Sequence, residues 1–293
     1  MVSPIRRLDE FVMQAPYRII PEAAEELNRL IPDHNMTLDI TTELGFDIDA
    51  VAHNGEVAIT ESALELLWAS AHANFIFYQE YVSSCKAEHQ QYTVGTTQRS
   101  LDAMDLLRWA IEKAKSKDTK EWPGHLPQPV AVPVEHSDIH VANELFLCAV
   151  AWSLHHEISH VELRHSFITA PFDLEEEKVA DVTASRQVLD TAPNTQQLEK
   201  RALGLISALI ALQYIDRNKT APSPQKRLHP YAFERLSHSL GVHAWEPNSM
   251  VLAFALVSLQ VYLGESKVPH KLEGDTFDDQ LNNFFISLSR CEV

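Results

Sequence analysis

The residues His156, Glu157 and His160 form the pattern HExxH, which is typical of hydrolases that use zinc. Residues four positions apart lie on the same face of an α-helix, so both imidazole rings can reach one ion. Neutral imidazole is a good zinc ligand, and Glu157 lies beside the rings, where it can accept a proton from a water molecule that zinc activates. His155 and His160 are five positions apart and face different directions, so the pattern has one workable register.

A catalytic zinc ion usually takes a third protein ligand and keeps a fourth position for water. Glu177 and Asp181 form the pattern ExxxD on the next expected helix, and Glu177 comes 17 residues after His160. We expect Glu177 to complete the ligand set and Asp181 to accept a hydrogen bond from the second ring nitrogen of a ligand histidine. Glu176, rotated by about 100° on that helix, is the second choice for the third ligand. His165 would reach the ion only if the first helix ends before it.

The hydrolysis of a carbonyl group also needs a hydrogen-bond donor for the oxyanion that develops. The segment LHPYAFERLSHSL, residues 228–240, supplies the candidates, and from it we take His229 and Arg235 as catalytic. Arg235 could also orient Glu177 or Asp181. An alternative interpretation explains these residues without a metal. The helix dipole favours an acidic first turn such as residues 173–177, and the histidines can form a solvated face.

The composition is that of a globular protein, with 45% hydrophobic and 22% charged residues in a chain of 293. The net charge of −17 argues against nucleic acid or an anionic membrane as the main partner. The apolar runs 202–215 and 250–263 are shorter than the roughly 20 residues that a bilayer requires. Three scattered cysteines and a start without an apolar signal segment favour a cytoplasmic location.

Periodicity and turn residues predict an α+β fold that is predominantly α-helical, with a small sheet near the N-terminus. Strands are expected at 36–43, 46–52 and 56–60, and Asn54-Gly55 predicts a tight turn between the last two. Helices are expected at 21–31, 61–82, 101–117, 139–165, 174–190, 195–217, 230–240, 248–264 and 276–290.

Four prolines make residues 121–138 an extended surface segment, with a short edge strand expected at 129–134, PVAVPV. This segment divides the prediction into an N-terminal α+β subdomain, residues 1–120, and a helical portion with the metal site, residues 121–293. We expect the two to form one continuous globular unit. In the helix that carries the motif, the upstream apolar residues, among them Trp152, are expected to anchor the site in the core.

The segments HHEISHVELRH, EEEKVAD and HPYAFERL together resemble the gluzincin metallopeptidases, whose pattern is HExxH followed by ExxxD on the next helix. This resemblance implies a zincin-like helical core and the hydrolysis of peptide bonds. It carries the ligand role onto His156, His160 and Glu177, the role of general base onto Glu157, and the supporting role onto Asp181.

The chain length and the segments DIDAVAHNGEVAI and LLWASAHANFIFYQEY are similar to the Lit-type phage-exclusion peptidases. That resemblance covers most of the chain. It implies a bacterial cytoplasmic zinc protease that cleaves a host protein, in that family a translation elongation factor, during phage infection.

The sequence therefore predicts a zinc-dependent endopeptidase with one zinc ion per chain, Glu157 as general base, and a protein or peptide substrate. The extended segment 129–134 favours a peptide, because gluzincins hold their substrate along an edge strand. The alternatives are a non-catalytic zinc-binding regulatory or sensor protein and a zinc hydrolase of small molecules. Glu157 favours an enzyme, since a structural zinc site needs no general base.

Overall fold

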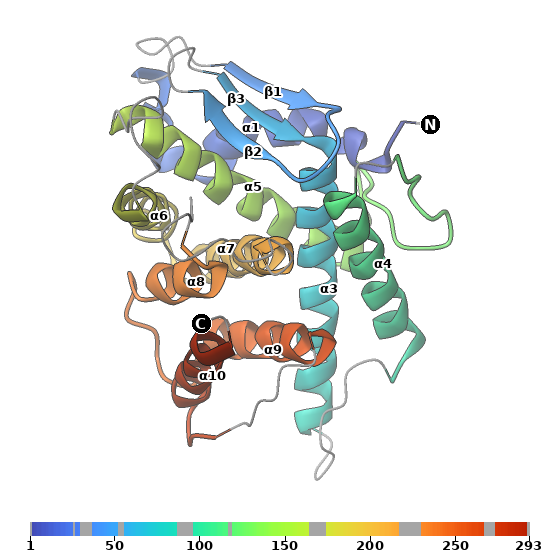
Figure 1. Ribbon diagram of the computed structural model, residues 1–293, viewed down its shortest axis with the longest axis vertical. Coiled ribbons are helices and arrows are strands. Elements are labelled where there is room, and N and C mark those ends of the chain that lie inside the picture. Colours follow the sequence, from blue (N-terminus) through green and yellow to red (C-terminus); the bar gives the residue numbers. More distant parts are fainter. Residues whose placement is uncertain are drawn as a thin grey trace.

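The structure is a computed structural model, and most of its residues lie in helices, with one small sheet at the top of the view in Figure 1. It describes residues 2–25, 27–29, 37–51, 56–86, 96–116, 119–163, 174–216, 230–266 and 273–291. The prediction of a predominantly helical α+β fold is confirmed.

The chain begins with a short 3₁₀ helix, η1 (Pro4–Leu8), and a helix that the sequence did not predict, α1 (Asp9–Ile19). Ser3 caps η1 by accepting a hydrogen bond from the backbone N–H of Ile5. Pro16 lies inside α1, and a proline inside a helix weakens the sequence signal for it. The helix predicted at 21–31 begins as the 3₁₀ turn η2 (Pro21–Ala23), and residues 24–25 and 27–29 are helical.

The three predicted strands form one mixed sheet in the order β1-β3-β2, from β1 (Thr37–Thr41), β2 (Ile48–Val51) and β3 (Glu56–Thr60). β1 runs parallel to β3, and β2 runs antiparallel to it. The expected Asn54-Gly55 turn lies outside the described residues. Val57 and Ile59 of the central strand are buried, as alternation along a half-buried strand requires. Because β3 lies between β1 and β2, β2 is an edge strand of the described sheet, and it packs against α5.

The remaining predicted helices are confirmed with bounds shifted by a few residues. They are α3 (Glu61–Lys86), α4 (Gln98–Lys115), α5 (Asp138–Glu162), α6 (Leu174–Leu189), α7 (Thr195–Asp216), α8 (Ala232–Leu240), α9 (Met250–Glu265) and α10 (Phe277–Cys291). α5 packs against α1, α3, α6, α7 and the sheet, so the helix with the HExxH pattern is central to the fold (Figure 1). Ser137 starts this helix by capping it, with its hydroxyl accepting from the N–H of His140.

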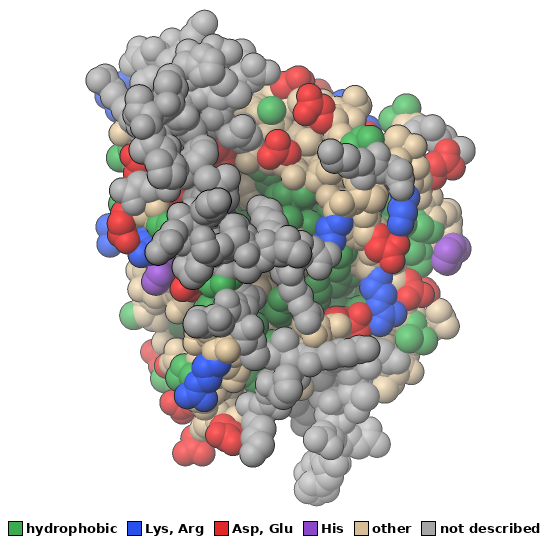
Figure 2. All heavy atoms as spheres, in the orientation of Figure 1, with side chains coloured by type: hydrophobic (Ala, Val, Ile, Leu, Met, Phe, Trp, Pro, Cys, Tyr) green, Lys and Arg blue, Asp and Glu red, His purple; other side chains and the backbone are tan. Residues whose placement is uncertain are grey.

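The surface shown in Figure 2 carries acidic and basic side chains next to one another around an apolar area. On the part of this face that the structure describes, the blue side chains do not merge into one basic surface. Among the described helices, none combines the length and the apolar character that crossing a membrane requires.

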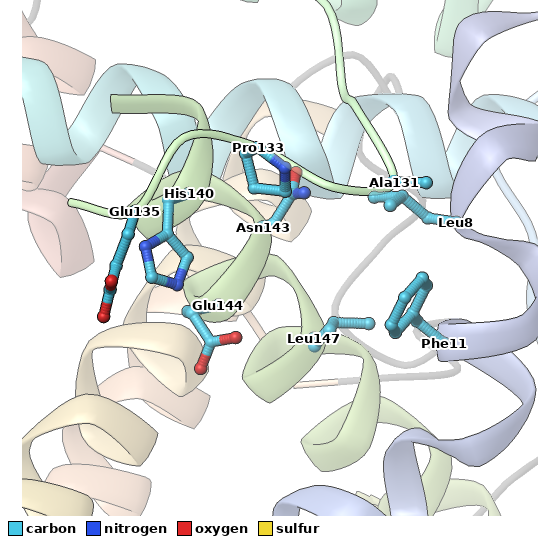
Figure 3. A pocket seen from close by; sticks show the side chains of 9 residues that line it. All are labelled: Leu8, Phe11, Ala131, Pro133, Glu135, His140, Asn143, Glu144 and Leu147. Atoms are coloured by element: carbon cyan, nitrogen blue, oxygen red, sulfur yellow. The ribbon is translucent and has the colours of Figure 1, made fainter. Parts of the chain in front are cut away.

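The proline-rich segment is extended, but the edge strand predicted at 129–134 is wrong. Proline has no N–H to donate to a strand partner, and side chains hold the backbone there instead, with Arg7 donating to the carbonyl of Pro129 and Asn143 to that of Val130. The segment covers a cavity of about 370 Å³ beside the N-terminal half of α5 (Figure 3). The cavity is lined by Leu8, Phe11, Ala131, Pro133, Glu135, His140, Asn143, Glu144 and Leu147.

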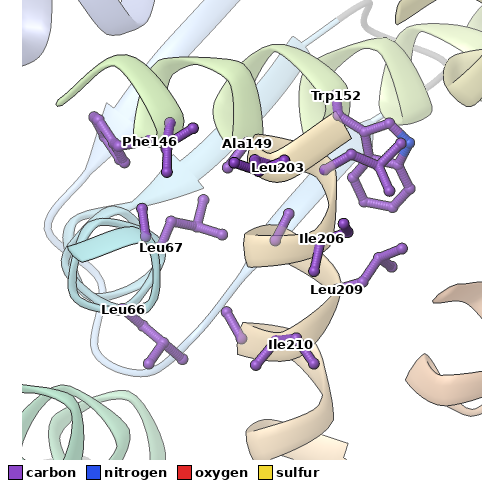
Figure 4. Packing of buried hydrophobic residues seen from close by; sticks show 14 of the residues in the cluster. Leu66, Leu67, Phe146, Ala149, Trp152, Leu203, Ile206, Leu209 and Ile210 are labelled. Atoms are coloured by element: carbon purple, nitrogen blue, oxygen red, sulfur yellow. The ribbon is translucent and has the colours of Figure 1, made fainter. Parts of the chain in front are cut away.

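The core lies where α3, α5 and α7 meet, and Figure 4 shows their apolar side chains interdigitating. The labelled side chains come from α3 (Leu66, Leu67), α5 (Phe146, Ala149, Trp152) and α7 (Leu203, Ile206, Leu209, Ile210). Gly204 lets α5 and α7 approach closely, because a Cβ at this position would overlap with the side chain of Cys148. This packing fixes α5 along its length, including the two turns that carry the chemical groups.

Candidate active site

The HExxH residues occupy the last two turns of α5 and are buried there, with exposed fractions of 4% for His156, 9% for Glu157 and 3% for His160. The two imidazoles lie on the same face of the helix, as the spacing predicts, and their Nε2 atoms are 3.1 Å apart. Their rings are nearly perpendicular, at 83°. His165, the alternative ligand, lies outside the described residues.

Glu177 comes from the first turn of α6, which packs against α5 and brings a buried carboxylate to the two rings. Its oxygens lie 3.5 Å from Nε2 of His156 and 3.3 Å from Nε2 of His160. Glu176 is half-buried, and the group of described residues that could hold a metal contains Glu177 in its place.

The spacing of these donor atoms fits a zinc ion. With zinc-to-ligand distances of about 2.0–2.1 Å and tetrahedral angles, two ligand atoms are separated by roughly 3.3 Å. The two Nε2 atoms are 3.1 Å apart, Oε2 of Glu177 lies 3.5 Å from that of His156, and Oε1 lies 3.3 Å from that of His160. Two imidazoles and one carboxylate are also a donor set that catalytic zinc sites use. The arrangement can therefore hold a zinc ion with only small shifts of these side chains.

Asp181 lies one turn after Glu177 and is buried behind His156, with its Oδ1 atom 3.0 Å from Nδ1 of that ring. Arg235 of α8 donates to the same carboxylate from Nε and Nη2, at distances of 2.7–3.1 Å. Burial would raise the pKa of Asp181, but the charge of Arg235 and the hydrogen bond from His156 lower it below its ordinary value. The carboxylate is therefore charged and fixed in orientation.

The protonation of His156 shows how strongly this pocket attracts a cation. Burial and the charge of Arg235 both lower the pKa of His156, but Asp181 and Glu177 outweigh them and raise it to about 9. The two buried carboxylates thus favour a positive charge on the side of the ring that faces them. A divalent ion would displace the proton from His156, because a metal ligand must be deprotonated.

His155 faces away from this group, as the single workable register predicts. Its Nδ1 atom lies 3.0 Å from Oε1 of Gln187 on α6, and burial lowers its pKa to about 4. His155 is therefore a neutral core residue, although the next residue, His156, belongs to the candidate metal group.

A cavity of about 150 Å³ opens beside Glu157 and Arg235. Its walls come from the start of β2, from α5, from the end of α7 and from α8, and consist of Phe46, Asp47, Ile48, Trp152, Ser153, His156, Glu157, Leu212, Ile215, Asp216 and Arg235. The wall near β2 is held in place, since the N–H of Phe46 donates to the carbonyl of Ala114 and that of Asp47 to Oγ1 of Thr60. Sequence reasoning did not place β2 here, although it predicted the strand itself.

The strand beside the site is therefore β2, and the extended segment 129–134 lies elsewhere. The cavity that this segment covers reaches along α5 as far as Leu147, which precedes His156 by nine residues, or about 13 Å of helix. The prediction that the segment 129–134 supplies the strand for a substrate is wrong. Of the two catalytic candidates in residues 228–240, Arg235 lies at the site and His229 lies outside the described residues.

Comparison with known proteins relates the chain to peptidases. The sequence model of a family described as Peptidase U49 matches residues 57–255, which is more than half of the chain and includes α5, α6 and α8. The chain belongs to the peptidase U49 family. It is also similar to the protein named "Cell death peptidase" of Escherichia coli (strain K12), with 30% identity over 298 residues and 99% of each chain covered. No solved structure matches the chain.

As a member of the peptidase U49 family, the protein is a peptidase, which confirms the predictions of an enzyme and of a protein or peptide as substrate. The buried group of His156, His160 and Glu177 is the candidate centre of that activity. It lies within the matched residues, as do Glu157, Asp181 and Arg235.

Proposed function

We propose that the protein is a zinc-dependent endopeptidase of the gluzincin type, with His156, His160 and Glu177 as the ligands of one zinc ion. The observation that carries this proposal is the buried group itself: the two Nε2 atoms are 3.1 Å apart, and each lies 3.5 or 3.3 Å from an oxygen of Glu177. His156 and Glu157 also line a cavity. The spacing fits zinc, and the cavity gives a substrate access to it.

Glu157 is the general base of the proposed reaction. Zinc, when bound, supplies a Lewis acid that makes water a better nucleophile and polarises the substrate carbonyl. Glu157 then accepts a proton from the water as the water oxygen bonds to the carbonyl carbon. It returns the proton to the peptide nitrogen as the C–N bond breaks, so the products are one new carboxylate and one new amine.

Asp181 and Arg235 have a positioning role in this proposal. Asp181 holds Nδ1 of His156, which directs Nε2 toward Glu177 and His160. Arg235 is 7% exposed and uses Nε and Nη2 on Asp181, so it acts through that carboxylate. His229 stays a prediction for the donor to the oxyanion.

The edge strand β2 is the proposed binding surface for the substrate backbone. It lies at the edge of the described sheet, and the residues at its start line the cavity with Glu157. An extended peptide that adds to such an edge gains main-chain hydrogen bonds and places its carbonyl groups in a fixed register. This gives the endopeptidase proposal the strand that the segment 129–134 does not supply.

The decisive experiment compares the wild type with Glu157→Gln by metal analysis and by peptidase assay. We expect about one zinc ion per chain in both proteins, and a loss of about 10²–10⁴-fold in hydrolysis for the variant. Casein and an E. coli extract serve as substrates, with new protein N-termini counted by mass spectrometry. Glu175→Gln is the matched control, since it makes the same change at an exposed residue of α6, and we expect it to leave activity intact. Equal hydrolysis by Glu157→Gln and the wild type would contradict the mechanism.

We further propose that the peptidase cleaves a protein of its own cell and acts in phage exclusion. The relative from E. coli is named for cell death, and a peptidase whose action kills the cell must cut a protein that the cell needs. Expression of the wild type in E. coli should reduce the plaque counts of some phages in a panel, while Glu157→Gln should behave like an empty vector. Protection by Glu157→Gln equal to that by the wild type would favour the alternative of a non-catalytic zinc-binding regulator.

A further inference from the structure

Trp152 lies on the same face of α5 as the two candidate histidine ligands, because Trp152, His156 and His160 follow one another at four-residue intervals. Its side chain is 1% exposed, and its ring packs against the imidazole of His156, with ring centroids 5.9 Å apart and planes at 29°. Its indole Nε1–H donates to Oγ of Ser185 on α6 at 3.0 Å. The indole is thus fixed between the two helices that supply the candidate ligands.

Trp152 also contacts the group that holds Asp181 in place. The guanidinium carbon of Arg235 lies 5.6 Å from the centroid of the indole, in the range of a cation–π interaction. The Nη2 atom of Arg235 lies 3.5 Å from both ring nitrogens of His156. Trp152, Arg235 and His156 therefore form one packed set of planar groups, and Asp181 is hydrogen-bonded to two of them.

The hydrogen bond to Asp181 cannot fix the ring of His156 alone. A hydrogen bond tolerates changes in its length and angle, so small coupled rotations about χ1 and χ2 still pivot the ring and swing Nε2 sideways. The flat indole beside the ring blocks the pivot, because the ring would have to enter the volume that the indole fills. Packing against Trp152 thus supplies the restraint that the hydrogen bond lacks.

We propose that Trp152 is a positioning residue, whose indole holds the imidazole of His156 and the guanidinium of Arg235 in the orientation that zinc binding needs. This inference rests on the proposed function and adds a residue that is neither a ligand nor a hydrogen-bond partner of one. Trp152 also lines the cavity beside Glu157, so its substitution would change hydrolysis in more than one way. Zinc affinity is therefore the primary readout.

The molecule contains a matched control in α3. Trp68 is fully buried, stacks on His72 four residues later with centroids 5.3 Å apart, and donates from Nε1 to Oδ1 of Asn143 at 2.8 Å. Trp68→Phe therefore removes the same atoms and the same kind of hydrogen bond as Trp152→Phe, away from the candidate ligands.

The test measures the zinc dissociation constant by competition with a chelator, together with urea unfolding, for the wild type and both variants. We expect Trp152→Phe to weaken zinc binding about 10-fold or more, as substitutions behind a metal ligand do, and Trp68→Phe to leave it within about twofold. Both should lose stability to a similar extent. Ser185→Ala keeps the indole and removes its hydrogen bond, so we expect weakening between these two values.

Two optical measurements test the contact itself. Cobalt(II) in place of zinc should give an altered visible absorption spectrum in Trp152→Phe and an unaltered one in Trp68→Phe, because only the first change loosens a ligand. Cobalt(II) should also quench part of the tryptophan fluorescence of the wild type and of Trp68→Phe, since Trp152 packs on a ligand ring. Trp152→Phe should lose that quenching.

The outcomes distinguish a failure of this inference from a failure of the proposed function on which it rests. A wild type that binds no zinc overturns both. Zinc bound by the wild type, with equal affinities in Trp152→Phe and Trp68→Phe, overturns the positioning role and leaves the metallopeptidase proposal standing. If Trp152→Phe does not fold, Ser185→Ala decides, and zinc affinity and cobalt spectra like those of the wild type would overturn the role of Trp152.

Discussion

Two tryptophan–histidine pairs in this protein have the same local arrangement, but the pKa values of their histidines are shifted in opposite directions. Trp68 and His72 in α3, and Trp152 and His156 in α5, are buried, four residues apart and stacked, and each indole donates to a side-chain oxygen. Burial lowers the pKa of His72 to about 4, whereas the pKa of His156 is raised to about 9 despite its burial. The helix that carries the histidine therefore does not decide its chemistry.

The difference comes from the second helix that each histidine meets. His156 faces Asp181 and Glu177 of α6, at 3.0 and 3.5 Å. The acidic group that affects the pKa of His72 is Asp138, whose charge raises it. Arg99 donates a hydrogen bond to Asp138, and the charge of Arg99 lowers the pKa of His72. Among the described residues, Nδ1 of His72 has no hydrogen-bond partner. A buried histidine becomes a candidate ligand only where another element brings carboxylates to it.

We expect the largest effect on zinc binding when the imidazole of each pair is removed in turn. His156→Ala should lose the stoichiometric zinc, because one of three protein ligands is gone. His72→Ala should keep one zinc ion per chain and lose only stability, through the cavity that it leaves. Metal analysis after dialysis distinguishes the two, and zinc retained by His156→Ala would mean that the ligands are wrongly assigned.

Asp181→Asn should have the next largest effect. We expect zinc affinity to fall about 10–100-fold, since the ligand His156 loses the partner that fixes its ring. The charge of Arg235 would also be left buried without its partner, at a cost of about 3–5 kcal/mol in the free energy of unfolding. Chelator competition and urea unfolding measure the two effects. Asp190→Asn, an exposed change at the end of the same helix, should show neither.

His72 should make the folded protein less stable in mild acid. Its pKa in the folded state, about 4, lies below the value of about 6.5 in the unfolded chain, so the unfolded chain takes up the proton first as the pH falls. Stability is therefore lost between pH 6.5 and 4, by about 2 kcal/mol at pH 5. Urea unfolding at pH 7 and pH 5 should show a smaller acid loss for His72→Leu than for the wild type. The same loss in both would show that His72 does not titrate in this way.

The smallest expected effect concerns the neighbour of the candidate ligand. Gln187→Ala removes the partner of His155 and should cost about 1 kcal/mol in the free energy of unfolding, with zinc affinity unchanged. A weaker zinc affinity in this variant would show that His155 contributes to the site through α5. It would contradict the separate roles inferred for His155 and His156.

Helical periodicity was enough to predict the grouping of the candidate ligands. The spacing of four residues put His156 with His160 and Glu177 with Asp181, and the structure brings these four side chains together. The helix bounds were also predictable, because apolar faces, caps and prolines mark them locally. α1 was missed, since Pro16 inside it obscures the helical pattern.

Contacts between elements distant in sequence could not be predicted in this way. The place of β2 beside Glu157 depends on how the sheet packs on α5, which no local pattern specifies. The sequence predicts Trp152 only as an anchor in the core, whereas the proposed positioning role depends on Arg235 and Ser185 from two other helices. The signal was present in the four-residue interval between Trp152 and His156, but the same interval separates Trp68 from His72.

The candidate ligands come from two helices, and Glu177 follows His160 by 17 residues. An ion held by both would act as a cross-link that restricts the denatured chain, much as a disulfide does when closing a 15-residue loop is worth about 3 kcal/mol. Metal supply would then govern the lifetime of the folded polypeptide as well as its activity, and the apoprotein would be the form that cellular proteases degrade first.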